Sequence, residues 1–132
     1  MRPLRFVRFV TARLDEDSGR RTGPFIAMGR LKRGAHLSKA ELDYWDEVRG
    51  WFDKNLKEPD RLSRSLHPRA QNKAIAWFKD TATEHIGRMH EIVELLREHG
   101  IEVDLLRTER PGFIVYEDQF QIAAEPFADT PT

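Results

Sequence analysis

Five stretches of the chain are rich in the apolar, β-branched and aromatic residues that favour β-strands. The second of them is almost continuously apolar, which is typical of an interior strand buried on both faces. In the third, Ile101, Val103 and Leu105 occupy alternate positions. The stretches are residues 4–14, 74–79, 101–107, 113–116 and 120–124. We predict a strand over each.

Two helices are predicted in the first half of the chain. Residues 24–33 begin with Pro24, which suits the first position of a helix, and Gly34 follows as a stop signal. Residues 38–58 have apolar side chains at helical spacing and begin with Ser38 and Glu41, the two ends of a capping box. Pro59 follows and cannot continue the helix.

A third helix is predicted between the second and third strands. Asp80 or Thr81 is expected to cap it, with the run Thr81-Ala82-Thr83-Glu84 matching a second capping box, and Gly100 is expected to end it. A strand, a helix and a strand in about 35 residues predict a βαβ unit with parallel strands and a right-handed crossover.

The predicted fold class is α+β. Pro111-Gly112 favours a type II turn and leads into the last two strands, so we expect a C-terminal β-hairpin. We predict a mixed sheet of four to five strands that contains one βαβ unit and this hairpin, with three helices packed on the sheet. Residues 1–127 are expected to form a single domain, and residues 128–132 a flexible C-terminal tail.

The apolar side of the predicted helix 38–58 is wider than one contact needs. Tyr44 and Trp51 extend its apolar arc to about 180°, whereas about 100° is enough to cover one surface. The helix is therefore expected to pack against two surfaces. We predict that Tyr44, Trp51 and the edge of the terminal hairpin form an interface between copies of the chain.

Composition narrows the possible functions. The chain has 132 residues, 39% hydrophobic and 33% charged, which is typical of a soluble globular domain. It has no Cys, which excludes disulfides, thiolate metal sites and cysteine nucleophiles. Arg residues interrupt the apolar N-terminal stretch, so we expect no signal peptide and a cytoplasmic location.

Charge is sorted into blocks although it sums to zero. Residues 1–40, 41–60, 61–79 and 80–132 carry net charges of +7, −4, +5 and −8. We expect the basic and acidic blocks to face one another, within one chain or between two.

Several motifs together resemble an uncharacterised group of small bacterial α+β proteins of about this length. They are WFDKNL at 51–56, WFKD at 77–80, EHI at 84–86, LLRTxRPGxIVYED at 105–118 and AEPF at 124–127. The resemblance covers most of residues 40–127. It implies a fold, and it implies no activity, cofactor or partner.

The predicted βαβ unit brings possible anion ligands to one edge of the sheet. Ligands of parallel sheets bind at the carboxyl ends of the strands, beside helix N-termini. The expected binding residues are Lys79, Thr81, Arg107, Arg110 and Tyr116. The alternative is that Lys79 and Arg107 pair internally with Asp80, Glu84 or Glu125. No glycine-rich phosphate loop accompanies these residues.

No catalytic or metal-binding constellation is visible, so we predict neither catalytic residues nor a metal or other cofactor. His85 and His90 lie five positions apart on a helix and do not share a face, and His85 fits a core position. His99 suits the negative end of a helix. No Ser lies in a nucleophile elbow.

Three functions remain open. The first is a non-enzymatic binding or interaction module that self-associates, as a dimer. The second is a small-anion or nucleotide-binding enzyme that uses Lys79, Thr81 and Arg107. The third is nucleic-acid binding through the basic segments 1–40 and 61–79, against which the balanced overall charge argues.

Overall fold

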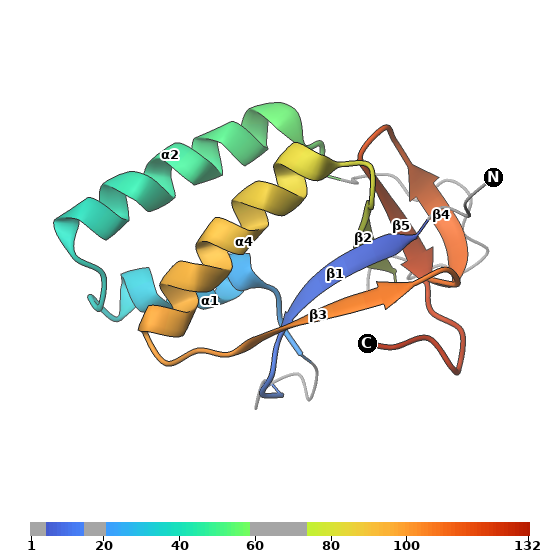
Figure 1. The fold of residues 1–132 in the computed structure, drawn as a ribbon, viewed down its shortest axis with the longest axis horizontal. Helices are drawn as coiled ribbons and strands as arrows, with labels where there is room; N and C mark the ends of the chain where they lie inside the picture. Colours follow the sequence, from blue (N-terminus) through green and yellow to red (C-terminus); the bar gives the residue numbers. More distant parts are fainter. Residues whose placement is uncertain (1–4, 15–20, 59–73) are drawn as a thin grey trace. The chain divides into compact units, whose positions relative to one another are not determined.

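A computed structural model describes residues 5–14, 21–58 and 74–132 (Figure 1). These residues form five strands and three helices. In chain order they are β1 (Phe6–Thr11), α1 (Pro24–Arg33), α2 (Lys39–Asn55), β2 (Ile75–Lys79), α4 (Thr83–Glu98), β3 (Val103–Thr108), β4 (Phe113–Glu117) and β5 (Gln121–Glu125). The α+β class and the count of five strands are as predicted. None of the described helices is both long enough and apolar enough to cross a membrane.

The five strands form one sheet in the order β3-β1-β2-β5-β4. The pairs β1–β2, β2–β5 and β4–β5 are antiparallel. β1 therefore lies between β2 and β3, the two strands of the predicted βαβ unit. The sheet is antiparallel rather than mixed as predicted, because the N-terminal strand occupies the position between them. The βαβ unit itself stays a prediction.

The chain divides into two compact units, and we describe each separately. The strand unit comprises Met1–Arg8, Glu58–Ile86 and Leu105–Thr132. The helix unit comprises Phe9–Lys57 and Gly87–Asp104.

The core of the strand unit lies on one face of the sheet. Trp77 on β2 is directly opposite Ile122 on β5, so both side chains point to the same face. With Phe6 and Ala124 they form a buried cluster, and Ile75, Leu106 and Ile114 pack against it partly buried. Side chains of β2 and β5 that point to this one face thus build a contiguous apolar cluster.

The helix unit is held together by contacts of α2 on two sides. The ring of Phe25 on α1 lies 5.5 Å from the Trp45 ring and 5.1 Å from the Phe52 ring. On its other side, α2 meets α4 through Tyr44, whose hydroxyl lies 3.2 Å from a Glu91 carboxylate oxygen. The two surfaces predicted for the wide apolar arc are therefore α1 and α4.

The predicted capping box of α2 is present. The Ser38 hydroxyl accepts a hydrogen bond from the Glu41 backbone N–H, and the Glu41 carboxylate accepts one from the Ser38 N–H. The second oxygen of Glu41 lies 2.7 Å from Nε2 of His99, just past the end of α4. One carboxylate thus fixes the start of α2 and ties it to the end of α4.

α1 ends at Arg33 with Gly34 as its C-cap, as predicted. Gly34 follows the helix with φ of −79°, and Ala35 instead adopts the left-handed conformation with φ of 58°. The His36 N–H donates to the Leu31 carbonyl and the Ala35 N–H to the Lys32 carbonyl, the two bonds of a Schellman motif. The glycine therefore lies one residue before the position that needs it.

We expect Ala35→Gly to stabilise the protein by about 0.5–1 kcal/mol. Glycine removes the steric cost of the left-handed conformation, and part of that gain is offset by the greater freedom of the unfolded chain. Urea denaturation followed by circular dichroism measures the change. As a control, Ala40→Gly in the first turn of α2 should destabilise, because that residue is helical. A destabilised Ala35→Gly variant would contradict the assignment.

Candidate functional site

Lys79, the first residue of the predicted anion site, is already paired with a carboxylate. It ends β2, and its Nζ lies 2.6 Å from a Glu117 oxygen at the end of β4. The Lys79 side chain is only 14% exposed, whereas that of Glu117 is 41% exposed. Lys79 therefore has an internal ion pair, the alternative to ligand binding that we considered. Its partner is Glu117, however, and not Asp80, Glu84 or Glu125.

The other residues of this edge do not converge on Lys79. Arg107 is exposed on β3 and has no ion pair with another described residue. Beside it in the chain, Glu109 lies 3.4 Å from Arg5, so this carboxylate has a basic partner of its own. With β1 between β2 and β3, Lys79 and Arg107 are on strands that are not neighbours.

Thr81 does not cap the third helix. α4 begins at Thr83, and the carbonyl of Ala82 accepts the first helical hydrogen bond, from the Ile86 N–H. The Thr83 N–H instead donates to the Thr81 backbone carbonyl. The helix thus starts one or two residues after the predicted cap, because the turn over Asp80 and Thr81 comes first.

Tyr116 is engaged in a turn centred on Asp118. The Tyr116 hydroxyl donates to one Asp118 oxygen at 2.8 Å, and the Gln121 side-chain amide donates to the same oxygen at 3.1 Å. The other oxygen accepts from the backbone N–H groups of Phe120 and Gln121. Partial burial acts to raise the pKa of Asp118, but these hydrogen bonds outweigh it and hold the pKa below its usual value.

This turn predicts a loss of stability in acid. Because the pKa of Asp118 is lower in the folded state, its contribution is present above the unfolded pKa of about 3.9 and is lost as the pH falls through the folded value. Asp118→Asn removes that contribution. We expect the difference in unfolding free energy between the native chain and this variant to be constant near pH 7 and to shrink below about pH 4. Urea titrations at several pH values measure it, and a difference independent of pH would contradict the assignment.

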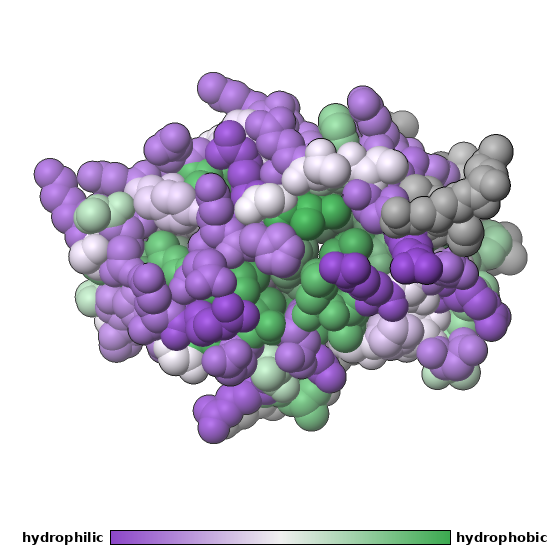
Figure 2. All heavy atoms as spheres, viewed as in Figure 1, coloured by the Kyte–Doolittle hydropathy of each residue, from purple (hydrophilic) through white to green (hydrophobic). Residues whose placement is uncertain are grey.

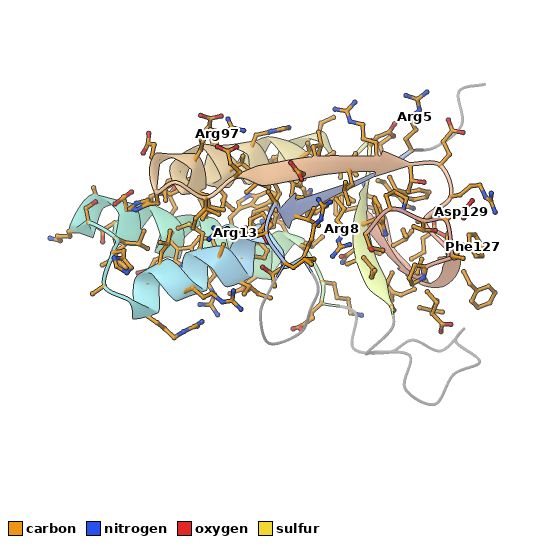
Figure 3. All side chains as sticks on the ribbon, turned by 90° about the horizontal axis from the view of Figure 1, so that it is seen from below. Arg5, Arg8, Arg13, Arg97, Phe127 and Asp129 are labelled. Carbon is orange, nitrogen blue, oxygen red and sulfur yellow. The ribbon has the colours of Figure 1, made fainter. Side chains whose placement is uncertain are left out.

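Arg110 belongs to a group at the end of the β4–β5 pair that the sequence patterns do not single out. Its guanidinium lies over the Phe127 ring at 5.3 Å and 3.5 Å from an Asp129 oxygen. Phe113, at the start of β4, is 47% exposed, and Phe127 is 43% exposed. We call Arg110, Phe113, Phe127 and Asp129 the aromatic end. Figure 3 shows Phe127 and Asp129 together beyond the strands.

The backbone of the aromatic end is fixed by the Thr130 side chain and by close packing at Gly112. The Thr130 hydroxyl donates to the Arg110 carbonyl at 3.1 Å and accepts from the Phe127 N–H at 3.1 Å. Thr130 is buried, although it lies in the segment predicted to be a flexible tail. Gly112 packs directly on the backbone of Glu125 and Pro126. A signal for this site was present in the sequence, since aromatic residues flank both the Pro-Gly turn and the last strand.

Tyr44 and Trp51, predicted to form an interface between copies, make contacts inside the helix unit. Arg88 of α4 lies over the Trp51 ring at 4.2 Å. Burial, together with the nearby Glu91 carboxylate, raises the pKa of Tyr44 to about 12. In Figure 2, hydrophilic residues cover most of the surface drawn over α2. The width of the apolar arc is thus explained within one chain.

The histidines have structural surroundings. His85 is buried, as expected of a core residue, with its ring 4.3 Å from the Phe120 ring and 6.2 Å from the Phe78 ring. His90 contacts Phe9 edge to face at 5.1 Å. Among residues 5–14, 21–58 and 74–132, no three His, Asp or Glu side chains gather as metal ligands would.

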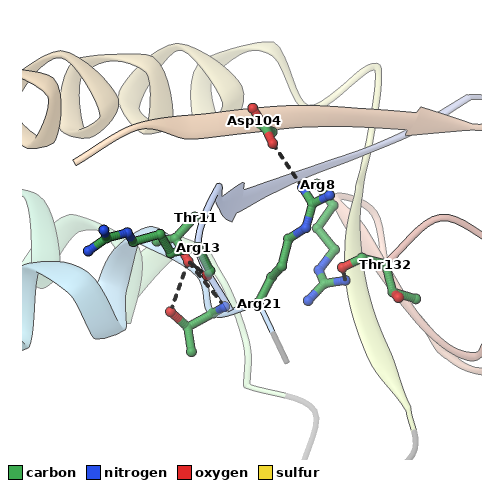
Figure 4. Close-up of polar contacts among 7 residues, drawn as sticks. Arg8, Thr11, Arg13, Arg21, Asp104 and Thr132 are labelled. Atoms are coloured by element: carbon green, nitrogen blue, oxygen red, sulfur yellow. Dashed lines mark hydrogen bonds and ion pairs between the residues drawn. The ribbon is translucent and has the colours of Figure 1, made fainter. Parts of the chain in front are cut away.

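The predicted basic segments are only partly described. In the helix unit, Arg21 pairs with Asp104 at 2.9 Å, and in the strand unit Arg8 donates to the carbonyl of Thr132 at 3.4 Å (Figure 4). Lys32 lies 3.7 Å from Asp46. Residues 61–73 of the second basic segment lie outside the described residues. Where they are described, several basic side chains therefore have acidic or carbonyl partners.

Comparison with protein-family models, curated proteins and solved structures found no match. The resemblance to a group of small bacterial α+β proteins thus stays a prediction.

Proposed function

We propose that the chain is a non-enzymatic interaction module of the bacterial cytoplasm that binds a second copy of itself through the aromatic end. The observation that carries this proposal is the exposure of Phe113 and of Phe127, over whose ring the Arg110 guanidinium lies. Trp77 and Ile122, the central aromatic and aliphatic residues of the same unit, are buried. Nearly half of the surface of Phe113 and of Phe127 is thus exposed to water, and contact with a partner would bury it.

The composition of the aromatic end is that of a protein interface. Phe and Arg are enriched at the centres of protein–protein contacts, where Lys, Glu and Asp are depleted. Each phenylalanine that becomes buried removes apolar surface from water, which is the main favourable term in association. Burial of the two phenylalanines therefore supplies a driving force for binding another protein surface.

A second copy suits this surface because its charges are balanced. Arg110 and Asp129 give the aromatic end one positive and one negative group. A surface that meets its own copy across a twofold axis must be complementary to itself, which a patch of one sign is not. The net charge of zero also means that two copies do not repel each other at long range.

The test is the molar mass in solution over a range of concentrations, by size exclusion with light scattering. We expect the 15.5 kDa chain to approach twice that mass at high micromolar concentration. Phe113→Ser with Phe127→Ser should keep it monomeric over the same range. Leu14→Ser is the control, since Leu14 is also exposed but belongs to the helix unit.

Two outcomes would reject the proposal. One is a native chain that stays monomeric at every concentration. The other is a doubly substituted chain that associates as strongly as the native one. The Leu14→Ser control separates loss of this surface from a general effect of removing exposed apolar residues.

The anion-binding enzyme and the nucleic-acid-binding protein have less support. The first needs Lys79 for a ligand, and Glu117 already neutralises it. The second needs free basic side chains, and Arg21 and Lys32 are paired with Asp104 and Asp46. The proposed interface does not use Tyr44 and Trp51, because Glu91 and Arg88 of α4 contact them within the chain.

A further inference from the structure

We infer that the two copies meet across a twofold axis at which Arg110 of each copy pairs with Asp129 of the other. This inference rests on the proposed function and specifies how the aromatic end recognises its partner. Phe113 and Phe127 of both copies form the centre of the contact, and the exchanged ion pairs form its rim.

The first argument is that the ion pair within one chain is weak and free to exchange. Arg110 and Asp129 are 3.5 Å apart, and their side chains are 69% and 71% exposed. A pair so exposed contributes little to stability, because water screens it and ordering two side chains costs entropy. Replacing the partner within the chain by the same partner from another copy therefore loses little.

The second argument is that the exchanged pairs gain from the contact. When the two copies come together, the groups of the rim exclude water from the phenylalanine rings at the centre, and the partner surface replaces part of the water around the rim itself. An ion pair in that rim is less screened than the same pair in open solvent. The association therefore favours Arg110–Asp129 pairs between copies over those within each copy.

The third argument is that the surface is held ready for binding. Thr130 joins the backbone of Arg110 to that of Phe127 through its hydroxyl, and the Arg110 N–H donates to the Thr108 hydroxyl. Gly112 keeps the turn packed against Glu125 and Pro126. Because the backbone around these four side chains is fixed, little ordering is needed on association.

The twofold arrangement makes a prediction that other arrangements do not. Arg110→Glu places two acidic groups at each rim contact, and Asp129→Arg places two basic groups there. Each variant alone should dissociate at least about tenfold more readily than the native chain, because like charges then face each other. An equimolar mixture of the two variants should recover association as a heterodimer. At one rim contact the introduced glutamate meets the introduced arginine, and at the other the native Arg110–Asp129 pair forms.

The test is sedimentation velocity, which measures the association of the native chain, of each variant and of their mixture. The matched control reverses an ion pair of the helix unit, with Glu94→Arg and Arg97→Glu, whose groups lie 2.8 Å apart in the native chain. These variants should associate like the native chain. Circular dichroism shows that each variant is folded, which is expected because all four side chains are exposed.

The outcomes separate the inference from the function beneath it. A native chain that never associates rejects the proposed function. A native chain that associates while the single variants do so equally well rejects the exchanged pairs and leaves the function standing. Weakened single variants whose mixture does not recover reject the twofold exchange. Recovery in the mixture alone supports the inference.

Discussion

Gly112→Ala should destabilise the protein by about 3–5 kcal/mol, because two independent effects act against the new methyl group. Gly112 has φ of 131°, a backbone conformation that L-residues with side chains rarely adopt. A Cβ at this position would also overlap the Glu125 carbonyl oxygen. That oxygen belongs to the backbone of β5 and cannot move aside cheaply. Urea denaturation measures the loss.

The matched control for this prediction is the same substitution in a helix. Gly50 lies within α2, and a Cβ there would meet no atom within 4 Å. Gly50→Ala should therefore stabilise the protein by about 0.5–1 kcal/mol. Equal effects of the two substitutions would show that the close approach of Gly112 to β5 is wrong.

Trp77→Ala should cost about 3–5 kcal/mol, the second largest effect that we expect. Trp77 is 1% exposed and lies at the centre of the cluster with Phe6 and Ile122. Removing the indole leaves a cavity that the surrounding sheet cannot close, because the positions of its strands are fixed by backbone hydrogen bonds. Circular dichroism in urea follows the unfolding without relying on the three tryptophans of the chain.

Trp77→Phe separates the packing of this side chain from its polarity. The buried Trp77 Nε1 finds no hydrogen-bond acceptor among the described residues. A buried donor without an acceptor costs about 1–3 kcal/mol, and phenylalanine removes that donor. The loss should therefore be about 1–2 kcal/mol, well below that of Trp77→Ala. Similar losses for both variants would contradict the core assigned to the strand unit.

Local features of the fold were predictable from the sequence because neighbouring residues determine them. The capping box at Ser38 and Glu41 depends on side chains three positions apart. The apolar run at 74–79 correctly indicated an interior strand of the sheet, although only Trp77 of β2 is buried, and burial on both faces was wrong. Gly34 correctly marked the end of α1, but a glycine signal does not show which residue then reverses the chain.

The order of the strands was not predictable in the same way. The run from β2 through α4 to β3 has the pattern of a βαβ unit, and nothing within those residues shows that β1 lies between the two strands. Hydrogen bonds between strands join residues far apart in the chain, so the local pattern does not determine them. The expected anion site depended on that pairing, and Lys79 instead pairs with Glu117.

The width of the apolar side of α2 correctly indicated two packing surfaces, which are α1 and α4. Tyr44 and Trp51 meet Glu91 and Arg88 of α4, so the partner lies in the same chain. Of the aromatic end, only Arg110 was singled out from the sequence. Aromatic residues near the Pro-Gly turn and the last strand gave a signal, but only the structure shows that Phe113 and Phe127 are exposed.

An isotope-filtered nuclear Overhauser experiment shows whether the aromatic end is where two copies of the chain meet. It uses an equimolar mixture of labelled and unlabelled native chain at high concentration and reports only proximities between copies. We expect contacts between the Phe113 and Phe127 rings of one copy and the same rings, or the Thr130 methyl group, of the other. Contacts confined to Tyr44 and Trp51, or none between copies at all, would contradict the account.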